Sequence, residues 1–159
     1  MNFPRDVVIN TDGGSRGNPG PAAIGAVIAS PDGEVLAEVS EALGVATNNV
    51  AEYTAALRAL ERAAELGARN VDLRSDSMLL IEQLNGRWKI KNPTLQVLNQ
   101  KVREAAKRFE SVRFAHVRRE RNVEADALVN QALDEWVATH GTPGLASKPA
   151  QGAFFDDER

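Results

Sequence analysis

The chain has 159 residues, of which 43% are hydrophobic and 26% charged, as is ordinary for a globular protein with one core. Its net charge of −3 excludes a uniformly basic protein, and the absence of cysteine excludes disulfides, thiolate metal sites and a cysteine nucleophile. No apolar run approaches the roughly 20 residues of a membrane helix, and the first residues do not resemble a signal peptide. We therefore expect a cytoplasmic protein that does not contact a membrane.

Three strands are predicted at the beginning of the chain. Residues 5–12 form a short apolar run that ends in a carboxylate, which is typical of a buried central strand. Residues 22–30 and 33–43 flank the sequence Pro-Asp-Gly, whose residues favour a tight turn, so these two stretches predict a hairpin. The first three strands are therefore expected to be antiparallel.

A long helix is predicted over residues 47–67. Thr47 or Asn48 can cap its first turn, and Gly67 can end it. Its apolar stripe is expected to consist of Tyr53, Leu57, Leu60 and Ala64.

Strands and helices alternate through the rest of the chain. We expect a strand at 68–76 with Val71 and Leu73 on one face, a helix at 77–86 closed by Gly86, a helix at 92–109 entered through Asn92-Pro93, a strand at 111–117, and a helix at 123–141 capped by Asn122. This order predicts one α/β domain over residues 1–140 with a mixed sheet. Residues 141–159 have no periodicity and are expected to be a disordered tail, although Phe154-Phe155 beside acids leaves a docking peptide as an alternative.

Four acids stand out by their positions. Asp12 and Asp76 each follow a predicted strand, so both would lie at the same edge of the sheet if those strands were parallel neighbours. Glu52 and Asp126 lie near the beginnings of two helices. Each acid alone has a structural explanation: Asp12 as a turn residue, Asp76 as a helix cap, and the other two as partners of a helix dipole.

A cluster of these carboxylates would need protons or cations to offset its repulsion. Oxygen ligands without cysteine favour Mg²⁺ or Mn²⁺ over zinc, and two such ions suit phosphodiester chemistry. The glycine-rich segment after Asp12 is not a nucleotide phosphate loop, because it lacks the lysine of that motif. It also lacks the alternating ligands of an EF-hand.

Four ordered blocks, TDGGSRGNPGPAAIG, TNNVAEY, RSDS and HVRRERNVEADALVN, resemble type 1 ribonuclease H, from about Val7 to Ala138. The short connection LNGRWKIKNPTL is similar to the compact branch of that family in archaea and many bacteria. The resemblance implies a ribonuclease H-like α/β fold, with a five-stranded mixed sheet flanked by helices. It further implies a monomeric endonuclease that cuts the RNA strand of RNA–DNA hybrids with two Mg²⁺, or Mn²⁺ as a substitute, leaving 5′-phosphate and 3′-hydroxyl ends.

The resemblance also assigns roles to residues. Asp12, Glu52, Asp76 and Asp126 match the catalytic, metal-binding carboxylates. The implied substrate contacts are Gly13, Gly14, Asn18, Thr47, Asn48, Asn49, Met78, Arg87, Trp88 and Lys89. Asn18, Asn48 and Asn49 would read the RNA minor groove, the glycines would bring backbone to the sugar edge, and Thr47 would lie beside a DNA phosphate.

The chain departs from many relatives at three places. Met78 replaces a glutamine that contacts the hybrid, and the extra basic helix of longer bacterial enzymes is absent. Residues 86–121 nevertheless carry eleven Lys and Arg against three Glu, as a phosphate-binding surface would need, although Lys101, Arg103, Lys107 and Arg108 taken alone fit the solvated face of one helix. His116, Arg118 and Arg119 are candidates for the auxiliary group that assists proton transfer or product release.

Two other functions remain open from the sequence. A catalytically silent module on the same fold would bind RNA or hybrid without cleaving it, although such a copy has no reason to keep all four acids. A related nuclease, such as a DEDD-type exonuclease or a transposase-like enzyme, is the other alternative. Those exonucleases carry an Asp-x-Glu pair in the first strand, whereas Gly13 and Gly14 follow Asp12 here.

Overall fold

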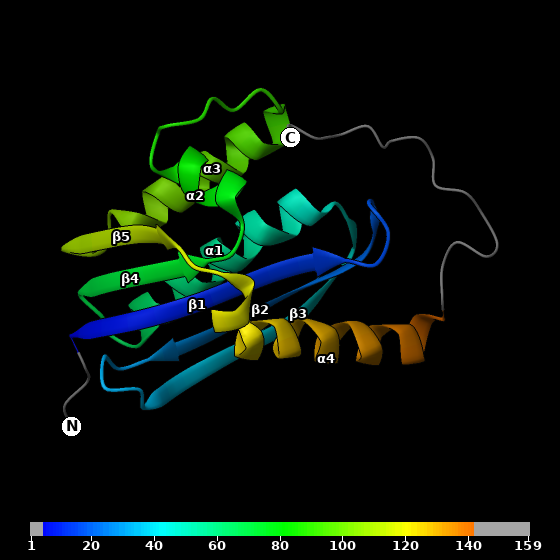
Figure 1. The fold of residues 1–159 in the computed structure, drawn as a ribbon, viewed down its shortest axis with the longest axis horizontal. Helices are drawn as coiled ribbons and strands as arrows, with labels where there is room; N and C mark the ends of the chain where they lie inside the picture. Colours follow the sequence, from blue (N-terminus) through cyan, green and yellow to red (C-terminus); the bar gives the residue numbers. More distant parts are fainter. Residues whose placement is uncertain (1–4, 142–159) are drawn as a thin grey trace.

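The computed structural model describes residues 5–141, which contain a five-stranded mixed sheet (Figure 1). Its strands are β1 (Asp6–Ser15), β2 (Gly20–Ala29), β3 (Val35–Ala46), β4 (Asn70–Ser75) and β5 (Ser111–His116). The spatial order is β3-β2-β1-β4-β5; the first three strands pair antiparallel, and β4 pairs parallel with both β1 and β5. The predicted fold class is confirmed. The expected tail, including Phe154-Phe155, lies outside the described residues from position 142 onward.

Helices cover both faces of the sheet (Figure 1). They are α1 (Asn48–Glu65), α2 (Met78–Leu84), α3 (Pro93–Ala106) and α4 (Val123–His140), with a short 3-10 turn, η1 (Arg119–Arg121), before α4. Helix α1 lies against one face with α3 beside it, and α4 lies against the other face. Within residues 5–141, no helix is both long and apolar enough to cross a membrane.

Local sequence chemistry sets three helix ends as predicted. The Thr47 hydroxyl caps α1 by accepting a hydrogen bond from the Val50 N–H at 3.2 Å. Gly67, just beyond α1, has a φ of 84°, a conformation that glycine adopts without steric cost. Asn92 caps α3 through the N–H groups of Thr94 and Leu95, and Pro93 begins the helix.

Asn122 does not cap α4 through its side chain, contrary to the prediction. Its side chain is buried and turns towards β1, where its amide donates to the Thr11 carbonyl at 2.8 Å and accepts from the Asn10 amide at 3.2 Å. The buried amide therefore fixes the start of α4 to the central strand, because leaving its polar groups unpaired would be costly.

Strand β1 continues three residues beyond Asp12, whereas the sequence suggested that it ended there. Gly13, Gly14 and Ser15 pair with Ile24, Ala23 and Ala22 of β2. Asp12 therefore lies inside a strand instead of in a turn.

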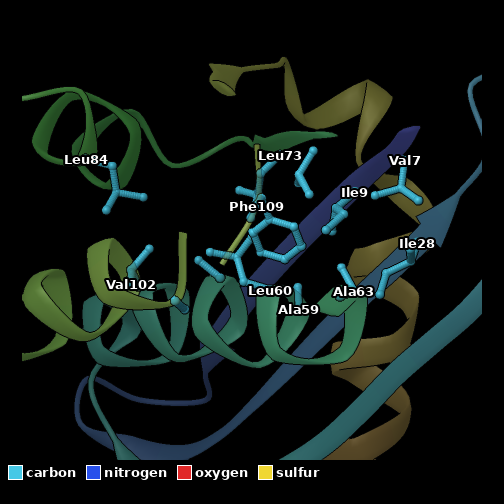
Figure 2. Close-up of a cluster of buried hydrophobic side chains, with 14 of the residues drawn as sticks. Val7, Ile9, Ile28, Ala59, Leu60, Ala63, Leu73, Leu84, Val102 and Phe109 are labelled. Carbon is cyan, nitrogen blue, oxygen red and sulfur yellow. The ribbon is translucent and has the colours of Figure 1, made fainter. Parts of the chain in front are cut away.

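The main core lies between the sheet and α1, with α2 and α3 completing it (Figure 2). Val7, Ile9, Ile28 and Leu73 from the sheet meet Leu60 of α1 there. The buried face of α1 differs from the predicted stripe, because Leu57 and Ala64 are only partly buried. Alanines fill much of that face: Ala51, Ala55, Ala56, Ala59 and Ala63. Short side chains allow the helix to approach the sheet closely.

Two glycines allow the helices to approach the sheet near the end of β1. A Cβ at Gly13 would overlap the Ala51 carbonyl of α1 and would lie 2.6 Å from the Glu52 nitrogen. On the other face, a Cβ at Gly25 would overlap the Ala125 carbonyl oxygen of α4 and would lie 2.9 Å from Leu128 Cβ. These glycines fix how closely each helix approaches the strands, since real Cβ atoms do not make such short contacts.

Candidate active site

Parallel pairing of β1 with β4 brings two of the predicted acids to one edge of the sheet. The last pair in this register is Thr11 with Ser75, so Asp12 is the next residue of β1 and Asp76 directly follows β4. The expectation that both carboxylates lie at this edge is confirmed. Such carboxyl ends are where α/β sheets place their sites.

Glu52 reaches the same place from α1. The N–H of Gly13, on the strand that holds Asp12, donates to Glu52 Oε1 at 3.1 Å. The close contact at Gly13 therefore brings the helix near enough for a strand amide to hold the glutamate side chain. Asp12, Glu52 and Asp76 each offer an oxygen, and these atoms all lie within 4.8 Å of one another.

This arrangement disfavours negative charge when no cation is bound. Burial, followed by the negative charge of Asp76 and then by a side-chain hydrogen bond with Asp126 and the charge of Asp126, raises the pKa of Asp12 to about 8. Burial is also the main reason that the pKa of Glu52 is raised well above its usual value, with Asp12 and Asp76 adding to it. A divalent cation would relieve both effects, and a set of hard oxygen donors suits Mg²⁺.

The structural explanations for three of the acids fail. Asp12 pairs within a strand, and Ser77, not Asp76, caps α2 through its hydroxyl at 3.2 Å from the Leu80 N–H. Glu52 lies beyond the first turn of α1, which contains no acid. Capping and helix-dipole roles therefore do not account for this cluster.

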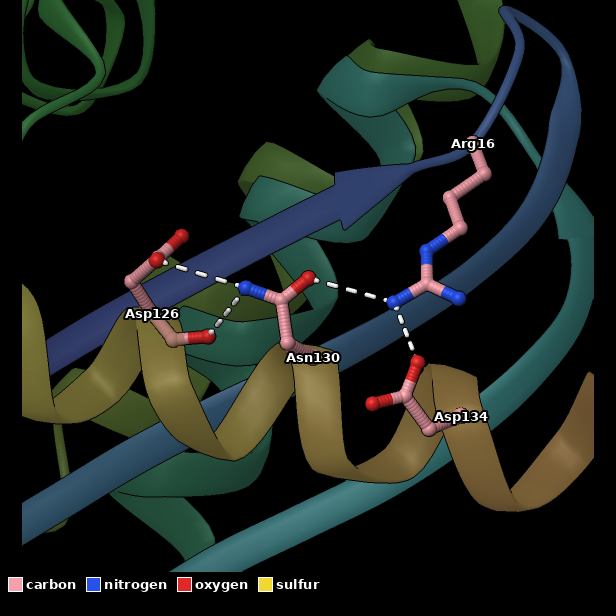
Figure 3. Close-up of polar contacts among 4 residues, drawn as sticks. All are labelled: Arg16, Asp126, Asn130 and Asp134. Atoms are coloured by element: carbon pink, nitrogen blue, oxygen red, sulfur yellow. Dashed lines mark hydrogen bonds and ion pairs between the residues drawn. The ribbon is translucent and has the colours of Figure 1, made fainter.

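Asp126 lies near the cluster but is held differently. It is exposed in the first turn of α4, and its side-chain hydrogen bond with Asp12 and its charge raise the pKa of Asp12, after the larger effects of burial and Asp76. The Asn130 amide donates to Asp126 Oδ2 at 3.3 Å and to the Asp126 carbonyl at 3.2 Å (Figure 3). The structure thus gathers three predicted acids closely and leaves the fourth at the rim, where a helix-dipole role also fits it.

All four acids line one open cleft of about 660 Å³. Five of the predicted substrate contacts also line it: Gly13, Gly14, Asn48, Asn49 and Trp88. Trp88 is 47% exposed, so its ring is available for contact with a ligand. Five others lie outside this wall: Asn18, Thr47, Met78, Arg87 and Lys89.

The outlying residues have identifiable positions. Asn18 accepts a hydrogen bond from the Asn48 N–H at 3.0 Å, so it orders the beginning of α1 beside the cleft. Arg87 forms a two-bond ion pair with Glu82, at 2.7 and 3.3 Å. Met78 is 45% exposed at the first position of α2. Their contacts with a substrate stay predictions.

The three candidates for the group that assists proton transfer or product release lie in two different places. Arg119 lines the acidic cleft, and its positive charge partly offsets the burial that raises the pKa of Glu52. His116 and Arg118 instead line a neighbouring hollow of about 490 Å³ together with Arg121. Of the three, Arg119 is placed best to act on a group in the cleft.

Several residues that line the cleft were not identified from the sequence, and two of them, Arg16 and Asn130, contact each other. Arg16 follows β1 and faces Asn130 and Asp134 of α4, and both Arg16 and Asn130 line the cleft. Asp126, Asn130 and Asp134 are spaced four residues apart and so share one face of the helix. That spacing is the signal that could have indicated a polar face extending from Asp126.

Comparison with known proteins agrees with this geometry. A family model described as "Reverse transcriptase-like" matches residues 10–132. Ribonuclease HI of Halobacterium salinarum is 48% identical over 124 residues, which cover 78% of this chain and 62% of that protein. Bifunctional protein Rv2228c of Mycobacterium tuberculosis is 48% identical over 129 residues, or 80% of this chain. The chain spans only 35% of the length of Rv2228c.

Solved structures show the same fold. RNase H1 from H. salinarum superposes with a TM-score of 0.80 at 46% identity, covering 82% of this chain and 98% of that one. LC11-RNase H1, solved in complex with an RNA/DNA hybrid, gives a TM-score of 0.79 at 43% identity, covering 82% of this chain and 99% of that one. Residues 10–132, which the family model matches, include all four acids. The chain therefore belongs to the type 1 ribonuclease H family.

Proposed function

We propose that this chain is an endoribonuclease that hydrolyses the RNA strand of RNA–DNA hybrids with two Mg²⁺ ions, leaving 5′-phosphate and 3′-hydroxyl ends. The observation that carries the proposal is the convergence of Asp12, Glu52 and Asp76, with oxygens within 4.8 Å of one another, in an open cleft. The relative solved with an RNA/DNA hybrid supports this choice of substrate.

The four carboxylates would hold the metal ions. Asp12 is central to this role, because Asp76 and Asp126 both act on its pKa and Glu52 lies beside it. Bound Mg²⁺ would supply an activated water and stabilise the leaving oxygen. Since burial and repulsion favour protonated Asp12 and Glu52, these residues would release protons on binding a cation.

The walls of the cleft fit a double-stranded ligand that contains ribose. Asn48 and Asn49 at the start of α1 present polar groups on one side, and Trp88 presents a ring on another. Amides that read 2′-hydroxyls would distinguish RNA from DNA, and the ring would pack against a sugar or base. Arg87 and Lys89 flank Trp88 and would add positive charge for the phosphates of the DNA strand.

We also propose that residues 1–140 constitute the catalytic domain and act as a monomer. The solved N-terminal RNase H domain of Rv2228c supports this boundary. The match covers 99% of that domain but only 81% of this chain. Gel filtration with light scattering tests the monomer, and a chain truncated after residue 140 that keeps full activity would support the boundary.

A cleavage assay with end-labelled substrates tests the function. The intact chain should cut the RNA strand of a hybrid in Mg²⁺ or Mn²⁺, should be inactive in EDTA, and should leave duplex DNA intact. Comparable cleavage of duplex RNA would contradict hybrid specificity. Binding of the hybrid without cleavage under all metal conditions would indicate the silent binding module instead.

A further inference from the structure

Arg16 connects the turn after β1 to helix α4. Its backbone N–H donates to the Pro21 carbonyl at 2.8 Å, which fixes the base of the side chain. Its guanidinium Nη2 donates to Asp134 Oδ1 at 2.7 Å and to Asn130 Oδ1 at 3.3 Å (Figure 3). One side chain thus contacts two residues of α4 that follow Asp126 by one and two helical turns.

The chemistry of Arg16 determines which way the Asn130 amide points. A guanidinium has only donors, so the group of Asn130 that faces it must be the carbonyl oxygen. The NH₂ group of Asn130 then faces Asp126 and donates to its carboxylate at 3.3 Å. An amide turned by 180° would place its oxygen against the carboxylate, where two acceptors repel each other.

Asp126 has less support from the core than Asp12 and Glu52 have. The Asp12 side chain is buried, and Glu52 is held by a strand amide, but Asp126 is exposed at the rim of the cluster. A carboxylate that must meet a metal ion benefits when a neighbouring donor fixes one of its oxygens.

We propose that Arg16 is a positioning residue for the metal site: it orients Asn130, which in turn orients Asp126, while Asp134 anchors the guanidinium. This inference rests on the proposed function, because it assigns Asp126 to metal binding.

Two other roles for Arg16 give different results. If Arg16 contacts a phosphate directly, replacing it should lower the affinity for the hybrid without changing the dependence on metal. If Arg16 forms only an ordinary surface ion pair, replacing it should change neither hybrid affinity nor metal dependence measurably. Arg58 provides a matched control for the second case, because its side chain is 43% exposed, against 42% for Arg16, and it pairs with Glu41 at 3.2 Å.

The experiment compares Arg16→Met, Arg16→Lys, Asn130→Ala, the double variant Arg16→Met with Asn130→Ala, and the control Arg58→Met. Mn²⁺ affinity is measured by calorimetry without nucleic acid, and hybrid cleavage is measured against Mg²⁺ concentration and against hybrid concentration. Arg16→Met should weaken Mn²⁺ binding and raise the Mg²⁺ requirement by about 10-fold or more. Arg16→Lys, which keeps a donor-only cation, should recover part of this loss.

The double variant separates action through Asn130 from independent action. If Arg16 acts through Asn130, the double variant should bind Mn²⁺ no more weakly than Asn130→Ala alone. Additive losses would overturn the proposal, as would an unchanged Mn²⁺ affinity in Arg16→Met, whether or not its KM for the hybrid rises. Should Arg16→Met fail to fold, Asp134→Asn removes the anchor instead and should weaken Mn²⁺ binding in the same direction.

The metal titration keeps this proposal distinct from the proposed function. An intact chain that cleaves no hybrid would contradict the function, yet the Mn²⁺ affinities would still test whether Arg16 positions Asp126. A chain that cleaves hybrid normally in every Arg16 variant, with unchanged Mn²⁺ binding, would leave the function standing and remove the role of Arg16.

Discussion

Helices α1 and α4 are both 18 residues long and each carries one predicted acid to the cleft, but the sheet holds them in different ways. Helix α1 buries a face of alanines, Tyr53 and Leu60 in the main core. Helix α4 packs through a smaller cluster, in which Val129, Ala132 and Leu133 meet Ala23. Core packing of α1 and the Gly13 N–H of β1 therefore hold Glu52, whereas a side chain of α4 itself, Asn130, holds Asp126 at the surface.

The helices on the two faces of the sheet therefore hold their acids by different means. An acid beside the core, such as Glu52, is costly to ionise without a cation. An acid at the rim costs little to ionise. Because the core does not hold Asp126, polar neighbours must fix its position. The predictions below separate these two ways of holding an acid.

The largest effect should come from Asp12, which lies between the acids of the two helices. Asp12→Asn should reduce hybrid cleavage by about 10⁴-fold or more, as when one member of a catalytic unit is removed. The fold should survive, because the change removes repulsion from a buried cluster. Steady-state cleavage with a circular dichroism melt measures both. Substantial remaining activity in a purified, folded variant would argue against metal catalysis by this cluster.

The two glycines test how closely each helix must approach the sheet. Gly13→Ala should displace α1 and Gly25→Ala should displace α4, each lowering the free energy of unfolding by about 1–3 kcal/mol. Gly14→Ala is the matched control, because its Cβ would lie 3.8 Å from Val129 Cγ1, at ordinary contact distance. Chemical denaturation measures all three. Equal stability in Gly13→Ala and Gly14→Ala would show that α1 is not tightly seated.

The metal-free stability of the protein should depend on pH in a way that Asp12 explains. Since its pKa is raised to about 8, folded Asp12 keeps a proton that the unfolded chain has already released above about pH 4. The free energy of unfolding should therefore fall as pH rises from about 4 to 8, and Asp12→Asn should flatten this decline.

Urea denaturation in EDTA across this pH range measures the effect. Asp126→Asn, which changes an exposed acid of α4, serves as the comparison. Saturating Mg²⁺ should restore stability most at the alkaline end, where the carboxylates are ionised. A decline of the same slope in wild type and Asp12→Asn would exclude Asp12 as its source.

The smallest effect concerns the buried polar contacts beneath α1. The Tyr53 hydroxyl donates to Gln83 Oε1 at 2.7 Å, and the Gln83 amide donates to the Lys89 carbonyl at 3.1 Å. Tyr53→Phe should cost about 1–2 kcal/mol of stability, because Gln83 loses a buried partner. It should also loosen the connection that carries Trp88, which a modest rise in KM for the hybrid would report. Leu57→Ala, on the partly buried side of α1, controls for stability loss without that contact.

Much of the fold could be predicted because its signals are local. Thr47 and Asn92 cap helices by bonding to residues two or three positions away, and the apolar runs predicted each strand. The meeting of Asp12 with Asp76 could also be anticipated, since it needs only that two strands be parallel neighbours.

Other features depend on contacts that no local pattern encodes. Gly13 was expected to bring backbone to a sugar, but its missing side chain also makes room for Ala51 of α1, 38 residues later in the chain. Asn122 suggested a cap, but its side chain binds a carbonyl 111 residues earlier. Arg16 pairs with Asp134 across 118 residues, so its place in the cleft became visible only once β1 and α4 were packed.

The buried Asn122 amide has a consequence for how this family member can vary. Because the Asn122 side chain binds the Thr11 carbonyl of β1 directly before α4 begins, we expect α4 to keep its position when the preceding loop changes length. Extra residues between Val117 and Arg118 would enlarge the rim beside the cleft while Asp126 kept its place. That loop is therefore a natural point for evolution, or an engineer, to append a new recognition element.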